Sequence, residues 1–393
     1  MEQLESDCII VGGGPAGMMA GLLLARAGVR VAVFEKHPDF LRDFRGDTIH
    51  PSTLQLMQEL GFLEEFLRLP HQKAPTLHAE IGGRQVAIAD FRRLPLACRY
   101  IAFMPQWDFL DFLARKAQAL PGFSLHMGVE TTGLIRAADR IAGIRWQGGA
   151  ARAALVIGAD GRQSVVRREA GLVVRDFGSA VDVLWLKLSR RPDDPAPAMS
   201  HAGPQQGLVL IDRGDYWQCG YVIRKGSHEE LKARGILAFR AALAALAPLP
   251  AERFDEITSW DQVHLLQIRM DRLEQWWAPG VLCIGDAAHA MSPVGGFGVN
   301  LAIQDAVAVA RILAGPLRAG QVGTRDLAAV QARRLFPTRA TQGLQRMMRR
   351  KRNDRGEAAP RPPGFVRAIA RMPALAHLMG RLIGMGFRTE RIR

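Results

Sequence analysis

The chain has 393 residues, of which 48% are hydrophobic and 23% are charged, and this composition is typical of a globular protein of about two domains. No apolar run reaches the roughly 18 residues that a transmembrane helix needs, and the acidic N-terminus lacks the order of a signal peptide, so we expect a cytoplasmic protein. The net charge is +14, but residues from Arg333 onward carry +13 of it, so the body of the chain is close to neutral.

The first predicted elements form a βαβ unit. Residues 7–11 predict a strand, residues 15–27 a helix, and residues 29–35 a second strand parallel to the first. Pro15 and Ala16 open the helix, because the missing N–H of a proline costs nothing in the first turn.

A glycine-rich turn joins the first strand to this helix. In Gly12-x-Gly14-x-x-Gly17, the first glycine permits a tight turn, the second lets a pyrophosphate approach the backbone, and the third lets the helix pack on the strand. The helix start offers free N–H groups to the phosphates. Glu35, followed by Lys36, ends the second strand and can accept hydrogen bonds from a ribose. The unit predicts a dinucleotide site, and a glycine-rich turn without a ligand is the alternative.

The middle of the chain predicts helices, a β-rich region, and then helices again. The segment 181–223 alternates apolar and polar residues, which favours an antiparallel sheet with one solvated or ligand-facing side. The other predicted segments are helices at 52–60, 104–120, 235–250 and mostly beyond 299, hairpin strands within 127–149, and a loop-like stretch at 349–364.

Two further turns combine an acid with glycines after a predicted strand. Asp160 and Gly161 lie in "IGADGRQSVVR" and, taken alone, are compatible with an ordinary turn. Asp286 opens "DAAHAMSPVGGFGVN", which leads into a helix. Because glycine is costly in backbone entropy, four glycines within residues 285–300 indicate a special backbone or the close approach of a ligand.

In this order, the three motifs make the chain similar to the FAD-dependent monooxygenases of the para-hydroxybenzoate hydroxylase type, the single-component aromatic hydroxylases. The resemblance covers about residues 6–315 and implies an α/β fold with three parts. These are a three-layer Rossmann-type FAD-binding domain (1–75, 100–175 and 276–315), an inserted, mostly antiparallel β-sheet substrate domain (76–99 and 176–275), and a helical, strongly basic C-terminal region (316–393).

The resemblance implies roles for the third motif. Asp286 would hold the ribityl hydroxyls of FAD by charge-assisted hydrogen bonds. Pro293 and the glycine loop up to Gly298 would lie against the isoalloxazine ring, because a Cβ there would block the ring. The helix opening at Val299 and Asn300 would direct its positive end to the pyrimidine edge, where reduced flavin carries negative charge.

The resemblance implies three more cofactor contacts. Arg45 would lie near the FAD pyrophosphate, Gln106 would reach the ribityl chain, and Asp160 would lie near both FAD and an incoming nicotinamide. A solvated arginine and a helix-start glutamine are the alternatives.

The implied reaction is a hydroxylation. Transient NAD(P)H reduces the bound FAD, dioxygen then forms a flavin hydroperoxide, and an oxygen atom passes to an aromatic or polycyclic small molecule. No catalytic acid or base is predicted. The alternatives are a flavin-dependent reductase or epoxidase of an isoprenoid-like substrate and a non-catalytic FAD-bound regulator. A flavin halogenase is disfavoured, because residues 276–279 read WWAP and do not match its Trp-x-Trp-x-x-Pro motif.

Several aromatic and histidine residues are candidates for the substrate pocket. Trp185, Met199, Trp217 and Tyr221, on the predicted middle sheet, are candidates to line a pocket between the flavin and that sheet, but plain core positions are the favoured interpretation. His50 is a candidate neighbour of a substrate hydroxyl, but a surface loop histidine is the favoured interpretation. We interpret His289 as part of the cofactor loop, and no cluster in the sequence has the spacing of a metal site.

The basic tail contains an apolar helical face. The residues that share this face of a helix beginning at Pro373 are Leu375, Leu378, Met379, Leu382 and Ile383. They predict a helix packed over the body, and peripheral contact with a membrane surface is the alternative. Nucleic acid is the least favoured partner, because aromatic residues do not interleave with the arginines.

Overall fold

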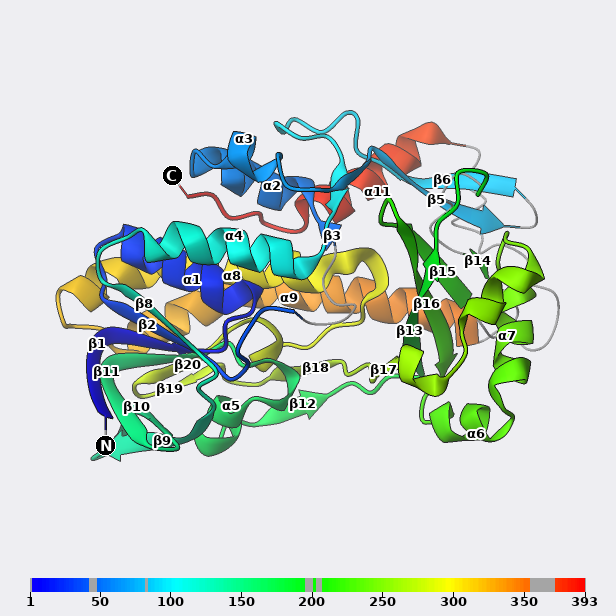
Figure 1. The fold of residues 1–393 in the computed structure, drawn as a ribbon. Coiled ribbons are helices and arrows are strands. Elements are labelled where there is room, and N and C mark those ends of the chain that lie inside the picture. The colour runs from blue at the N-terminus through cyan, green and yellow to red at the C-terminus, as the bar shows by residue number, and fades with distance from the viewer. Residues whose placement is uncertain are drawn as a thin grey trace.

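The computed structural model describes residues 2–41, 48–81, 84–194, 201–202, 207–353 and 372–392. A Rossmann-type sheet forms one half, with strand order β19-β20-β11-β1-β2-β8 (Figure 1). Within this order, the strands from β20 to β8 are parallel to one another, whereas β19 is antiparallel to β20. The strands are β1 (Glu2–Val11), β2 (Val31–Glu35), β8 (Phe123–Met127), β9 (Thr131–Ala137), β10 (Arg140–Trp146), β11 (Gly149–Gly158), β19 (Trp277–Ala278) and β20 (Val281–Cys283).

This half has three layers, as predicted, with the sheet in the middle. Helices α1 (Pro15–Arg26), α4 (Gln106–Gln118) and α8 (Phe297–Arg318) cover one face, and the β9–β10 hairpin with α5 (Val165–Glu169) lies on the other (Figure 1). Helix α1 is apolar on all sides because it is buried between the sheet and its neighbouring helices. Strand β1 begins five residues before the predicted start, because residues 2–6 pair with the first half of β11.

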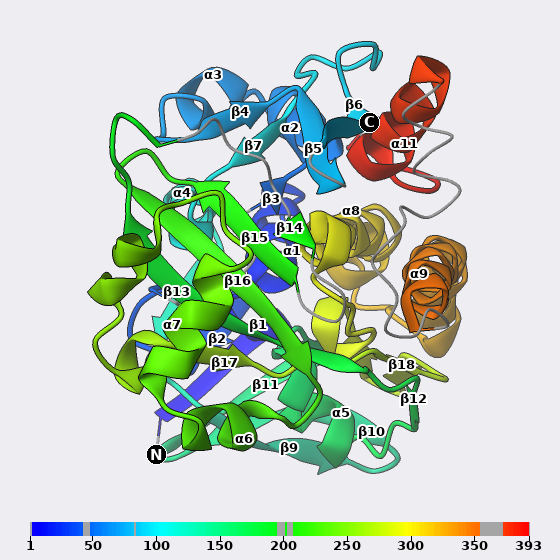
Figure 2. The same cartoon turned by 90° about the vertical axis from the view of Figure 1, so that its right-hand side faces the viewer.

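A second, mostly antiparallel sheet forms the other half, with order β17-β13-β16-β15-β14-β5-β6. Helices α6 (His228–Ala233) and α7 (Ile236–Ala244) lie on its outer side (Figure 2). Its strands are β5 (Thr76–Ile81), β6 (Arg84–Asp90), β13 (Val181–Ser189), β14 (His201–Ala202), β15 (Gly207–Asp212), β16 (Tyr216–Arg224) and β17 (His264–Leu266). The α/β class and the inserted sheet are therefore confirmed.

Short elements connect the two halves. They are β3 (Thr48–Ile49), β4 (Gln72–Ala74) and β7 (Ile101–Phe103) in a three-stranded sheet, the ribbon of β12 (Val174–Asp176) and β18 (Asp271–Leu273), and helices α2 (Pro51–Glu59) and α3 (Leu63–Phe66).

The C-terminal region is helical. Helix α9 (Thr324–Asn353) packs on α8, and α11 (Pro373–Met385) packs on β6. The loop predicted at 349–364 is wrong for residues 349–353, which continue α9, and its remainder lies outside the described residues. The arginine-rich composition concealed the helix, although arginine itself has a favourable helix propensity.

Helix α11 begins at Pro373, as predicted, and lies close to the body. A Cβ on Gly380 would come within 1.9 Å of the carbonyl oxygen of Asp90. Met379 and Ile383 pack into an apolar cluster with residues of β6 and α8, whereas Leu378 is 52% exposed. Packing against the protein thus accounts for most of the apolar face.

One helix in the described part of the chain, residues 294–318, is long and apolar enough to cross a membrane. Its apolar stretch is 67% buried inside the protein, where α8 lies between α1 and α9. Packing therefore explains its composition.

Candidate functional site

Three turns meet at one edge of the parallel sheet. Strands β1, β11 and β20 are neighbours, and the register aligns Val11 with Gly158 and Gly158 with Cys283. The chain leaves all three strands at the same end, which is where ligands bind in open α/β sheets. The three motifs of the sequence are thereby brought together.

The first turn has the geometry of a phosphate site. Gly12 has φ +105°, and a Cβ there would lie 2.4 Å from the carbonyl oxygen of Ala159. A Cβ on Gly17 would lie 1.9 Å from the oxygen of Gly12. Gly14, in contrast, is the N-cap of α1 without a side-chain cap, and no atom lies within 4 Å of the position its Cβ would take. The start of α1, at Pro15, therefore borders open space and is free to bind an anion.

Glu35 lies beside this turn at the end of β2. Its Oε2 accepts a hydrogen bond from the backbone N–H of Gly13 at 2.8 Å, and its Oε1 accepts one from His37 N–H at 3.1 Å. The half-buried carboxylate is thus placed next to the glycine turn, while Lys36 is exposed.

The carboxylate of Asp160 is engaged by its own turn. It accepts hydrogen bonds from Ser164 Oγ at 2.5 Å and from Val166 N–H at 3.1 Å. Burial raises its pKa, and these hydrogen bonds oppose the shift. The carboxylate therefore supports the start of α5, whose N-cap is Ser164, and a contact of Asp160 with FAD or a nicotinamide stays a prediction.

Asp286 is held by an arginine that the sequence analysis did not single out. Arg162 Nε lies 2.9 Å from Asp286 Oδ2, and the two side chains are 26% and 32% exposed. Arg162 belongs to the second motif, so this ion pair joins the second turn to the third. The sequence could have suggested a role for Arg162, because it directly follows Asp160 and Gly161 in the second motif.

The third turn needs its glycines for two different reasons. Gly295 and Gly296 have φ of +82° and +62°, and a Cβ on Gly296 would lie 2.0 Å from Thr48 Oγ1. These two residues are thus required by the backbone and by the neighbouring chain. No atom lies within 4 Å of the Cβ position on Gly298, where open space borders the first turn of α8. Of these glycines, Gly298 is the one that leaves space for a flat ring, as predicted for the loop. Pro293, at the start of the loop, is half-buried.

The side chain of Asn300 supports the loop from behind. Its Oδ1 accepts hydrogen bonds from His50 N–H at 2.9 Å and Thr53 Oγ1 at 2.8 Å, and its Nδ2 donates to the carbonyls of Thr48 at 2.9 Å and Gly296 at 3.0 Å. The side chain has no capacity left for a flavin, so any contact from this residue comes from the helix start that it shares with half-buried Val299.

His50 is not a surface loop histidine. Its side chain is only 1% exposed, and burial lowers its pKa to about 4, so the imidazole is neutral at physiological pH. The histidine lies behind α8, where its ring meets Phe297 edge-on at 5.8 Å. The interpretation of His50 as a surface loop histidine is therefore wrong. It could not be corrected from the sequence, because the residue that binds the His50 N–H, Asn300, is 250 residues away.

Two other expected contacts are less defined. Gln106 is the first residue of α4 and is half-buried, as a helix-start position would be. Arg45 lies outside the described residues. Met199, another residue of the predicted middle sheet, lies outside them as well.

The three aromatic candidates lie on two different faces of the second sheet. Trp217 and Tyr221 are buried on the outer face under α7, where Tyr221 meets Phe239 at 5.7 Å and Trp217 donates to Asp194 Oδ2 at 2.7 Å. They are core residues, and the prediction that they line the pocket is wrong. Trp185 is on the inner face and packs toward the start of α8.

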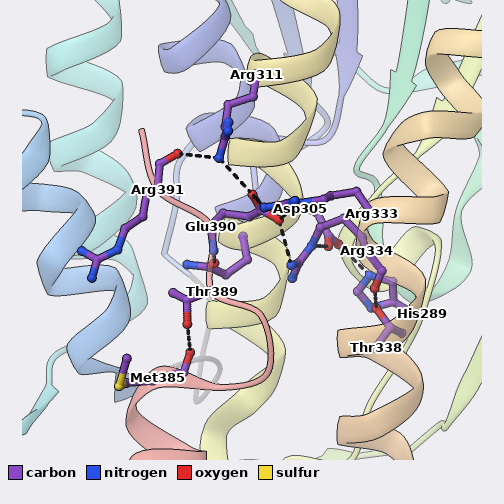
Figure 3. A network of polar contacts seen from close by, with 11 residues as sticks. His289, Asp305, Arg311, Arg333, Arg334, Thr338, Met385, Thr389, Glu390 and Arg391 are labelled. Carbon is purple, nitrogen blue, oxygen red and sulfur yellow. Dashed lines mark hydrogen bonds and ion pairs between the residues drawn. The ribbon is translucent and has the colours of Figure 1, made fainter. Parts of the chain in front are cut away.

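A buried polar network supports the third turn (Figure 3). Asp305 on α8 accepts a hydrogen bond from Gly285 N–H at 3.1 Å, lies 2.6 Å from His289 Nε2, and pairs with Arg334 Nε at 2.9 Å. Arg334 on α9 lies 3.5 Å from Glu390 of the C-terminal segment. His289 is therefore structural, as interpreted, and no group of metal-binding residues occurs in the described part of the chain.

Comparison with known proteins identifies the family of the chain. The family described as "FAD binding domain" matches residues 5–343. The chain belongs to the FAD binding domain family. The observed site fits FAD, because two helix starts border open space at Gly14 and Gly298 and the carboxylates of Glu35 and Asp286 lie beside them.

Two relatives and one solved structure resemble the chain over much of its length. The 6-methylpretetramide 4-monooxygenase of Streptomyces rimosus is 34% identical, over 99% of this chain and 94% of the relative. Rifampicin monooxygenase of Streptomyces venezuelae is 31% identical, over 76% of this chain and 62% of the relative. The structure of the anhydrotetracycline hydroxylase OxyS from Streptomyces rimosus has a TM-score of 0.77 and 22% identity, covers 97% of this chain and 76% of its own, and shows the same fold.

The resemblance to the para-hydroxybenzoate hydroxylase type is confirmed by these matches. The chain is an FAD-dependent monooxygenase with FAD as its cofactor, and NAD(P)H is the co-substrate typical of its family.

The Arg162–Asp286 pair gives a first prediction. Asp286→Ala is expected to raise the dissociation constant of FAD by roughly 10–100-fold, because a charge-assisted hydrogen bond to a ribityl hydroxyl contributes about 1.5–3 kcal/mol. Fluorescence titration of the apoprotein with FAD measures this. Asp139→Ala, at an exposed hairpin turn, is the control. An Asp286→Ala protein that binds FAD as tightly as the control would contradict the assignment.

Proposed function

We propose that this monooxygenase hydroxylates a polycyclic aromatic small molecule. The observation that supports this most strongly is the 34% identity to 6-methylpretetramide 4-monooxygenase along nearly the full length of both chains. A second relative is named for its action on rifampicin. We therefore infer a large, flat, electron-rich substrate.

The inner face of the second sheet supplies apolar surface for such a substrate. Trp185 and Ile211 on this face pack in one cluster with Met291 and Phe297 at the third turn. A Cβ on Gly220 would lie 2.8 Å from the Trp185 ring, so the indole lies flat over this glycine. Flat apolar walls of this kind suit the face of an aromatic ring system.

The residues of the chain have three tasks in this proposal. The turns after β1, β11 and β20 bind and orient FAD, which, when bound, supplies the hydride acceptor and the oxygen-activating chemistry. Trp185, Met291 and Phe297 exclude water next to the reacting ring. The start of α8, with no side-chain cap, stabilises negative charge that develops in front of it.

Substrate-stimulated turnover tests the proposal. FAD-loaded protein is mixed with NADPH or NADH, dioxygen and a panel of polycyclic phenols. We expect at least one compound to accelerate NAD(P)H oxidation and to yield a product that mass spectrometry shows to be heavier by one oxygen atom. NAD(P)H oxidation that no compound of the panel stimulates, with no oxygenated product, would contradict this substrate class.

The two faces of the second sheet allow a paired test of the pocket. Trp185→Ala is expected to raise the substrate KM about 10-fold while FAD affinity is unchanged, because a stacking wall is lost. Trp217→Phe, on the outer face, is expected to lower stability by about 1–2 kcal/mol through the lost hydrogen bond to Asp194, with KM unchanged. Steady-state kinetics and thermal unfolding separate the two effects. A KM that rises only in the Trp217 variant would place the substrate elsewhere.

A further inference from the structure

A small, partly open cavity lies behind the first turns of α8, between the start of α2, α8, α9 and the end of α11. Its volume is about 20 Å³, enough for one water-sized occupant. Its apolar lining includes Phe297, Leu301 and Ile383, and its polar lining includes His50, Gln304 and Arg334.

The polar side chains bring unmatched donors to this cavity. Arg334 Nη1 and Nη2 and Gln304 Nε2 have no hydrogen-bond partner among the residues that the structure describes. Both side chains are at least nine-tenths buried. Arg334 Nη1 lies 3.5 Å from Glu390 Oε1, which gives attraction but no hydrogen bond. Buried donors without an acceptor are costly, so an unmatched set in one place indicates an occupant.

The occupant must accept hydrogen bonds. Guanidinium and amide N–H groups can only donate, and the two amide oxygens at the cavity are already engaged. Asn300 Oδ1 accepts from His50 N–H and Thr53 Oγ1, and Gln304 Oε1 accepts from the backbone N–H of Glu390. The hydroxyl groups of Ser52 and Thr341 complete the polar lining, and a hydroxyl group can donate to an anion or accept from water.

The surrounding charges favour an anion as well, and Figure 3 shows these charged groups except Glu59. Within the described ion pairs of this region, four guanidinium groups face three carboxylates, so the region carries an excess positive charge. These groups are Arg311, Arg333, Arg334 and Arg391 with Asp305, Glu390 and Glu59.

We propose that this cavity binds a small monovalent anion of the halide type, held by Arg334 and Gln304 and closed by His50. The anion joins α8, α9 and the C-terminal segment. Because Asp305 links Arg334 to the backbone of Gly285 in the third turn, an occupied cavity also stabilises the turn that binds FAD.

Bromide locates the site directly. Crystals of the FAD-loaded protein are grown in sodium bromide, and anomalous scattering is measured at the bromine edge. We expect a bromine peak in the cavity within hydrogen-bonding distance of Arg334 and Gln304. Density for water alone, or an empty cavity, without an anomalous signal would overturn the proposal.

Thermal unfolding in solution tests the same site independently. The melting temperature of the FAD-loaded protein is expected to rise saturably, by roughly 2 °C, when bromide or chloride replaces gluconate at constant ionic strength. Gln304→Glu keeps the oxygen that binds Glu390 N–H but removes the donor, and should abolish the rise. Thr338→Val is the control, because Thr338 bonds to the carbonyl of Arg334 but does not line the cavity.

Equal melting temperatures of the wild-type protein in halide and gluconate would contradict the proposal. So would an unchanged halide effect in Gln304→Glu. If this variant does not fold, the bromide crystals still decide.

Discussion

Asp305→Ala is expected to destabilise the protein by about 3–5 kcal/mol, because it leaves the buried Arg334 without the carboxylate that accepts its hydrogen bond. The Arg334 side chain is 1% exposed, and its Nε lies 2.9 Å from Asp305 Oδ1. Burial alone would raise the pKa of the Asp305 carboxyl. The nearby His289 and Arg334 lower it by more, so the pKa lies below its ordinary value. The substitution also removes the acceptor for Gly285 N–H.

Denaturant unfolding of the apoprotein measures this change. Asp215→Ala, at an exposed turn, is the control and should stay within about 0.5 kcal/mol of the wild type. The same Asp305→Ala protein is expected to bind FAD more weakly, since the third turn loses its anchor. A stability equal to that of the control would show that the network does not hold α8 and α9 together.

Two glycines of the first motif are expected to respond in opposite ways to the same substitution. Gly14→Ala should leave the stability of the apoprotein unchanged, because the backbone has φ −73° and no atom lies within 4 Å of the new methyl group. The methyl group would occupy the space of the pyrophosphate, so the dissociation constant of FAD should rise by roughly 10–100-fold, or about 1.4–2.8 kcal/mol.

Gly17→Ala should instead destabilise the apoprotein itself, because its Cβ would lie 1.9 Å from a backbone oxygen that cannot move alone. Thermal unfolding and FAD titration of both variants separate the two effects. If Gly14→Ala bound FAD normally, the pyrophosphate would have to lie elsewhere.

The sequence predicted the fold where local patterns determine it. The βαβ unit, Pro15 at the start of α1 and Pro373 at the start of α11 follow from helix and strand signals within a few residues. The alternation of apolar and polar residues in β13 indicates that the strand has two different faces, but not which face lies nearer the cofactor. The sequence therefore does not separate Trp217 and Tyr221 from Trp185, since only the packing of α7 distinguishes the faces.

The long-range contacts of the site could not be predicted from the sequence. The Arg162–Asp286 pair spans 124 residues, and the Asn300–His50 bond spans 250. The sequence does indicate that Asp305 is unusual, because it is an acid within the apolar run "LAIQDAVAVA" of a helix. A lone buried acid in such a run requires a partner from elsewhere, and here the partners are His289 and Arg334.

Reconstitution with FAD tests most directly whether the turns after β1, β11 and β20 grip a single flavin nucleotide. The purified chain, stripped of any flavin, is titrated with FAD and followed by visible absorbance and by calorimetry. The account predicts saturation at one FAD per chain, with a perturbed flavin spectrum. A chain that is correctly folded by circular dichroism but takes up no FAD would contradict it.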